Sequence, residues 1–86
     1  MRTLKLNPVY RLQWEPVQHA HVLLYPEGMV KLNESAGEIL KRCDGTRDLE
    51  TLIDELEKAF DVRDLGHDIR SFIAHAEERG WLEPTT

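Results

Sequence analysis

The chain has 86 residues, of which 41% are hydrophobic and 31% are charged, and its formal net charge is −5. This balance is typical of a globular domain rather than a disordered chain, and no apolar run approaches the ~18 residues that span a bilayer. The negative charge argues against a general nucleic-acid binder, which needs a basic surface to displace counterions. We therefore expect a single domain over residues 1–86, in which residues 1–8 form a flexible N-terminal arm.

Two features of the chain indicate a cytoplasmic protein. Its one cysteine, Cys43, cannot form an internal disulfide, which fits a reducing compartment. Residues 1–8 also contain no apolar stretch of the kind that a signal peptide requires. We expect a cytoplasmic location and no contact with a membrane.

The first third of the chain has the pattern of short strands. Residues 9–14 alternate, so that Tyr10, Leu12 and Trp14 share one face, as in a half-buried strand. Residues 20–25 form a second and more apolar segment. Together they predict the start of an antiparallel sheet.

A tight turn follows at residues 26–28, Pro-Glu-Gly, where proline presets φ and glycine tolerates a positive φ. Residues 29–32 then predict a third short strand. Alternation buries either the odd-numbered or the even-numbered side chains of this strand. Because Val30 and Leu32 are the more apolar pair, we expect them to face the core.

The next segment predicts an amphipathic helix. Asn33 can cap it, while Ser35 and Glu38 offer a competing capping box, and Gly45 is expected to end it. Its apolar side is formed by Ala36, Ile39, Leu40 and Cys43.

Two further helices are predicted, one capped by Asp48 and one capped by Asp64 and ended by Gly80. Their apolar residues recur at helical spacing, at Leu49, Leu52, Ile53, Leu56 and Phe60 and then at Leu65, Ile69, Phe72, Ile73 and Ala76. Trp81 and Leu82 are expected to fold back as an apolar plug. Strands followed by three helices predict an α+β fold with a small three-stranded antiparallel sheet, similar to a winged helix-turn-helix.

No pattern in the chain predicts catalysis or a metal site. The four histidines, at positions 19, 21, 67 and 75, lack the spacing of zinc ligands, and the carboxylates fall at helix caps or on solvent-facing positions. Cys43 has no base partner in the sequence, so a buried structural thiol is expected. We therefore expect no enzyme activity, no metal and no cofactor.

The winged-helix arrangement leaves three functions open. A DNA-binding regulator is disfavoured because the expected recognition helix, residues 64–79, carries four acidic residues against two arginines. An extended peptide pairing with the open edge of strand 29–32, beside the third helix, fits better. The same edge also suits a second copy of the chain, so a self-pairing dimerisation module, and hence a homodimer, is the third alternative.

Several motifs occur in an order and spacing that resemble a known family. They are Leu24-Tyr25-Pro26-Glu27-Gly28, Leu32-Asn33-x-x-Ala36-x-x-Ile39-Leu40, Cys43-Asp44-Gly45-Thr46-Arg47, Asp68-Ile69 and Gly80-Trp81-Leu82. From about residue 8 to residue 82 the chain resembles the PqqD family of pyrroloquinoline quinone (PQQ) biosynthesis, although residues 61–67 do not align with it. That family is similar to the recognition elements of ribosomally made, modified peptides (RiPPs).

The resemblance implies a non-catalytic peptide chaperone. Such a protein binds the precursor peptide PqqA by strand addition and presents it to the radical S-adenosylmethionine (SAM) enzyme PqqE, which supplies the iron–sulfur chemistry. In the recognition-domain family the peptide lies beside the third strand and against the third helix. Carried over to this sequence, that arrangement implies backbone pairing by Met29, Val30, Lys31 and Leu32 and contacts from Asp68, Phe72 and His75.

Overall fold

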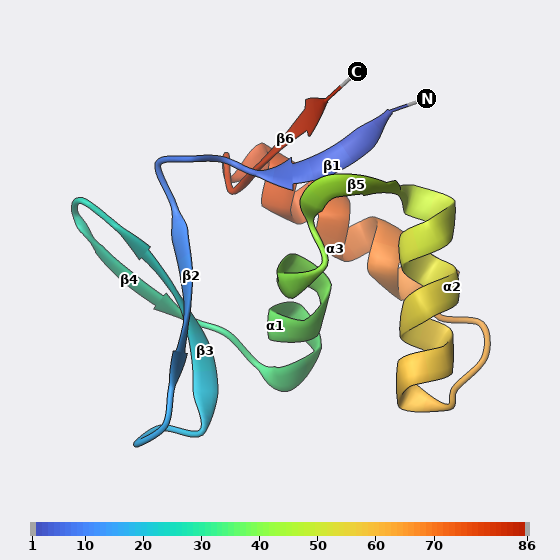
Figure 1. Ribbon diagram of the computed structural model, residues 1–86, viewed down its shortest axis with the longest axis horizontal. Helices are drawn as coiled ribbons and strands as arrows, with labels where there is room; N and C mark the ends of the chain where they lie inside the picture. Colours follow the sequence, from blue (N-terminus) through green and yellow to red (C-terminus); the bar gives the residue numbers. More distant parts are fainter. Residues whose placement is uncertain (1, 86) are drawn as a thin grey trace.

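The computed structural model describes residues 2–85, with side chains through residue 83 (Figure 1). In chain order the elements are β1 (Thr3–Leu6), β2 (Arg11–Glu15), β3 (Ala20–Tyr25), β4 (Gly28–Lys31), α1 (Glu34–Lys41), β5 (Asp44–Asp48), α2 (Leu49–Phe60), α3 (Gly66–Glu78) and β6 (Leu82–Thr85). The expected α+β class, with a three-stranded antiparallel sheet and three helices, is confirmed. A second small sheet is present in addition.

The expected sheet has the strand order β2-β3-β4, with antiparallel pairing throughout. Leu12 lies opposite Leu23, and Leu23 lies opposite Val30, so the apolar residues share one face. Figure 1 shows α1 beside β3, with β4 at the outer side of the sheet. The turn between β3 and β4 needs no positive φ at Gly28, contrary to the role that the sequence suggested for this glycine.

The second sheet has the order β5-β1-β6, so its central strand comes from the start of the chain. We expected residues 1–8 to form a flexible arm, but residues 3–6 pair on both sides within this sheet. The physical reason is that Leu4 is 5% exposed and belongs to the core. The strand therefore anchors the N-terminal segment.

α1 ends earlier than its sequence suggested. Arg42 is the C-cap, and Gly45 lies in β5 with a φ of 90°. The chain turns there because it must run back along β1, where the Leu6 N–H donates to the Cys43 carbonyl at 3.0 Å. At the other end Asn33 is the cap, since its Oδ1 accepts from the Ala36 N–H at 2.8 Å.

Of the N-terminal caps expected for the other two helices, one is confirmed and one is wrong. Asp48 caps α2 as expected and accepts from the Thr51 N–H at 2.9 Å. The expectation that Asp64 caps α3 is wrong, because Asp64 has a φ of 62° and precedes Leu65, the residue at the N-cap position. The Leu65 N–H instead donates to the Glu57 carboxylate of α2 at 2.9 Å.

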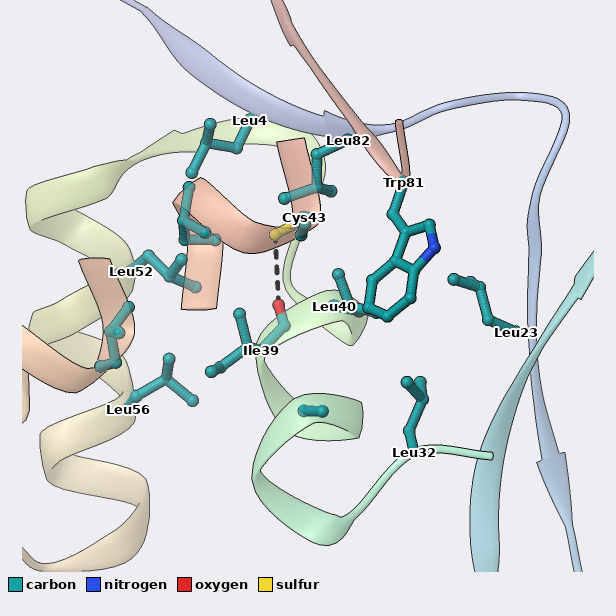
Figure 2. Close-up of a cluster of buried hydrophobic side chains, with 14 of the residues drawn as sticks. Leu4, Leu23, Leu32, Ile39, Leu40, Cys43, Leu52, Leu56, Trp81 and Leu82 are labelled. Atoms are coloured by element: carbon teal, nitrogen blue, oxygen red, sulfur yellow. Dashed lines mark hydrogen bonds between the residues drawn. The ribbon is translucent and has the colours of Figure 1, made fainter. Parts of the chain in front are cut away.

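The core lies between the helices and the two sheets, as Figure 2 shows. Gly80, with a φ of 79°, ends α3, and the Trp81 N–H donates to the Ala76 carbonyl at 2.9 Å in a Schellman-type cap. This turn directs the buried Trp81 side chain into the core, where Figure 2 places its indole near Leu40 and Leu23. The expected apolar plug at the end of α3 is therefore present.

Candidate functional site

The candidate site starts at β4, an edge strand whose only strand partner within the described residues is β3. The Leu32 N–H donates to the His21 carbonyl at 3.0 Å, which makes this a hydrogen-bonded pair. Because such pairs alternate along an antiparallel ladder, Val30 also bonds to β3, while the N–H and C=O groups of Met29 and Lys31 point to the open side.

The side chains of residues 29–32 alternate between the core and the solvent. Leu32 is 5% exposed in the core and Val30 packs against it, whereas Met29 is 51% exposed and Lys31 is exposed. The expected burial of the even-numbered pair is confirmed. Thus Val30 and Leu32 hold the strand on the domain, and Met29 and Lys31 offer the free backbone groups.

A pocket of about 420 Å³ begins two residues after β4. It lies between the start of α1, the end of α2 and the first half of α3. Its lining includes Asn33, Ala36, Phe60, Leu65, Asp68 and Phe72. The walls are mainly apolar, and the exposed Asp68 adds a carboxylate at the surface. Such a pocket suits an apolar side chain of a bound peptide.

The structure separates the residues that the resemblance implied. Asp68 and Phe72 line the pocket together, and Phe72 also lies 6.4 Å, centroid to centroid, from Trp81. His75 is not among the lining residues, and its ring meets Trp81 edge-on at 5.7 Å. The β4 residues form a separate part of the site, at the open strand edge.

Sequence reasoning missed the contribution of the connection between α2 and α3. Val62 and Leu65 line the pocket from this connection, next to Phe60 at the end of α2. Val62 is 46% exposed and stands between the charged residues Asp61 and Arg63. That isolated valine was the available signal for an apolar recognition surface here.

Cys43 is a structural residue. It lies just beyond α1 rather than on it, is buried, and its thiol donates to the Ile39 carbonyl at 3.3 Å (Figure 2). Burial raises the pKa of the Cys43 thiol to about 12, with a further contribution from the nearby Asp44 carboxylate. The thiol is therefore protonated at neutral pH and is not an activated nucleophile.

In the part of the chain that the structure describes, no three His, Cys, Asp or Glu side chains gather as metal ligands would. Nor does any helix within residues 2–85 have the length and apolar character needed to cross a membrane.

Comparison with known proteins gives a consistent family match. The model of a family described as "Coenzyme PQQ synthesis protein D (PqqD)" matches residues 20–82. A curated relative from Methylococcus capsulatus, named "PqqA binding protein", is 43% identical over 79 residues, which are 92% of this chain and 85% of the relative. A relative of the same name from Pseudomonas fluorescens is 50% identical over 82 residues, covering 94% and 90%.

Two solved structures share the fold. One is the solution NMR structure of the PqqD truncation of Methylobacterium extorquens PqqCD, described as a functional and stand-alone RiPP recognition element. It matches with a TM-score of 0.76 and 29% identity, covering 93% of this chain and 87% of that chain. The heterocyclase TruD matches with a TM-score of 0.75 over 99% of this chain and 12% of its own, at 19% identity, and this likeness concerns the fold alone.

Proposed function

Because the chain belongs to the PqqD family, and is thus a recognition protein of PQQ biosynthesis rather than an enzyme, we propose that it binds a PqqA-type precursor peptide. The relatives named "PqqA binding protein" support this ligand. The observation that carries the proposal is the open edge of β4 close to an apolar pocket.

The peptide binds as an additional strand along β4. Its backbone pairs with the outward N–H and C=O groups of Met29 and Lys31, as in other cases of strand addition. Val30 and Leu32 contribute indirectly, because their burial fixes the position of the edge. Main-chain pairing supplies affinity that depends little on the peptide's sequence.

Selectivity comes from the neighbouring pocket. An apolar side chain of the peptide enters the space between α1 and α3 and contacts Phe72, while the Asp68 carboxylate faces polar groups of the peptide. His75, whose ring meets Trp81 edge-on outside the pocket lining, contributes less to peptide contact than Phe72 does. A pre-formed pocket reduces the ordering that binding requires, which favours affinity.

The bound peptide is then presented to the radical SAM enzyme PqqE in the cytoplasm. A carrier of this kind needs a strand edge and a pocket but no nucleophile, which agrees with the protonated state of the Cys43 thiol. The free cysteine also fits a reducing compartment.

The test is a titration of ¹⁵N-labelled protein with a synthetic PqqA peptide, followed by backbone amide shifts. We expect saturable shifts at residues 28–33 and in the first half of α3. Lys31→Pro removes an outward N–H and should abolish binding in a folded protein, whereas Lys31→Ala keeps the backbone group and should bind almost as well as wild type. Val30→Pro removes a bond within the sheet and should disturb folding itself.

Wild-type peptide affinity in folded Lys31→Pro would exclude strand addition at β4. Sedimentation of the apo protein is the second measurement, because a homodimer paired through the same edge would dissociate as peptide is added. A dimer that is unaffected by saturating peptide would place self-association at another surface.

A further inference from the structure

A smaller cavity of about 180 Å³ lies between α1 and the end of the β2–β3 hairpin that carries the turn. Trp14, His19 and His21 contribute from the hairpin, and Glu34 and Glu38 contribute from α1. Trp14 belongs to β2, which is the opposite edge of the sheet from β4. Glu34, at the start of α1, lines both this cavity and the larger pocket, whereas Trp14, His19 and His21 line this cavity alone. The aromatic side of the cavity therefore stays accessible while a peptide lies along β4.

The aromatic side chains of this cavity pack against each other and against α1. Trp14 pairs with His21 across the ladder, and their rings meet edge-on with centroids 5.1 Å apart. His21 in turn lies directly against α1 at Gly37, where an added Cβ would be 2.7 Å from His21 Nδ1. The imidazole thus lies between the helix and the indole, and Trp14, which lines the cavity, is 50% exposed.

The other side of the cavity carries two carboxylates one helical turn apart. Glu38 is engaged by Arg42, whose guanidinium lies 2.8 Å from the carboxylate and holds the pKa of Glu38 below its ordinary value. Neither Arg42 nor its neighbour Lys41, which lies 3.4 Å from the same carboxylate, lines the cavity. Among the ion pairs of the described residues none involves Glu34.

An exposed indole beside a carboxylate that makes no ion pair within the described residues is the combination that recognises an organic cation. A neutral or anionic group would gain nothing from Glu34. We propose that the Trp14–Glu34 cavity binds one basic side chain, an arginine or lysine, presented by a partner protein. The identity of the partner rests on the proposed function. It is the enzyme that receives the peptide, because a carrier must contact the peptide and the enzyme at the same time.

The site itself is tested with a small probe that needs no partner. Labelled protein is titrated with Nα-acetyl-arginine amide and, separately, with its neutral isostere Nα-acetyl-citrulline amide. We expect the Trp14 indole N–H signal to shift saturably with arginine and not with citrulline. Glu34→Gln should weaken arginine binding by about fivefold, whereas Glu83→Gln, the same change at an exposed residue of β6, should leave it unchanged. Equal responses to the two probes, or no response to arginine, would overturn the proposal.

The partner is tested with PqqE and the variant Trp14→Leu, which keeps an apolar side chain and removes the aromatic face. We expect enzyme binding to weaken by about tenfold, with peptide affinity within twofold of wild type. Unchanged enzyme binding, or a loss confined to peptide affinity, would refute the assignment to the enzyme. Failure of the wild-type protein to bind PqqA would contradict the proposed function instead, and the arginine titration would still decide the site.

Discussion

The Glu57 carboxylate of α2 accepts a hydrogen bond from the backbone N–H of Leu65 at 2.9 Å, so one helix supplies the cap for the next. α3 has no side-chain cap of its own. The same helix carries Asp68 and Phe72 to the pocket. The contact therefore fixes the start of α3 and, with it, one wall of the candidate peptide site.

Glu57→Ala is expected to destabilise the domain by about 1 kcal/mol, the usual loss for a removed N-terminal cap. Glu57→Gln retains a carbonyl acceptor at the same place and should recover most of this loss. Asp64→Asn should have little effect, because Asp64 does not cap the helix and asparagine also tolerates the left-handed φ of 62° at this position. Urea unfolding measures all three, and a Gln variant as unstable as the Ala variant would mean that charge, rather than the hydrogen bond, holds α3.

The two helical glycines should respond oppositely to the same substitution. Gly37→Ala gains helix propensity but places its Cβ 2.7 Å from His21 Nδ1, so we expect a net loss of about 1–3 kcal/mol from overpacking. At Gly66 the nearest atom, 2.9 Å from an added Cβ, is the mobile end of Arg70, so Gly66→Ala should be stabilising.

Thermal unfolding compares the two glycine variants. Adding His21→Ala to Gly37→Ala should restore part of the stability, since it removes the colliding ring. If Gly37→Ala raised the melting temperature as much as Gly66→Ala does, the close approach of His21 to α1 would be wrong.

Two aromatic residues on α3 should differ in their effect on peptide affinity. Phe72→Ala removes a pocket wall and is expected to weaken PqqA binding by about tenfold or more. His75→Ala leaves the pocket lining intact and should bind within about twofold of wild type. Calorimetric titration of folded variants is the measurement, and equal losses at both positions would show that the peptide reaches as far as Trp81.

Acidification should remove stability through the cap of α2. The hydrogen bond from the backbone N–H of Thr51, which lies 2.9 Å from the Asp48 carboxylate, lowers the pKa of Asp48 in the folded protein. An aspartate whose pKa is lowered by folding stabilises the folded protein at pH values above its ordinary pKa of about 3.9. This stabilisation is lost as the pH falls through the lowered pKa. The melting temperature of the wild-type protein should therefore fall as the pH drops below about 3.9.

Asp48→Asn retains a capping oxygen but cannot titrate, so its melting temperature should fall less between about pH 5 and pH 2. A series of melting curves on both proteins over this range checks the expectation. Parallel curves would assign the acid sensitivity to other carboxylates, among them Asp44, whose pKa is also lowered, chiefly by its hydrogen bond from the Thr46 side chain.

The helices and the first sheet were predictable because their apolar residues recur with a clear period. The second sheet was not. β5, Asp44–Asp48, contains no apolar residue, and β6 contains Pro84, which argues against a strand. These strands are held by pairing with β1 rather than by a pattern of their own. Long-range pairing of this kind leaves no local signal.

The candidate site was predictable only in part for a related reason. Asp68 and Phe72 fall on a regular helix, so their common direction follows from spacing. Which backbone groups of β4 face outward depends instead on the Leu32–His21 bond, and the apolar wall at Val62 depends on how α2 and α3 are joined. The cavity at Trp14 needs the close approach of α1 to His21, which no single segment encodes.

β1 and β6 are neighbours in one sheet, with Thr3 opposite Thr85, and Figure 1 shows both ends of the chain on the same side of the molecule. A short linker could join them head to tail without crossing β4 or α1. New termini could then be opened in the exposed turn at residues 16–18, which line neither cavity, since circular permutation is best tolerated at such sites. The recognition surface is in this sense independent of where the polypeptide starts, and the same unit can be tethered through one corner to a larger protein.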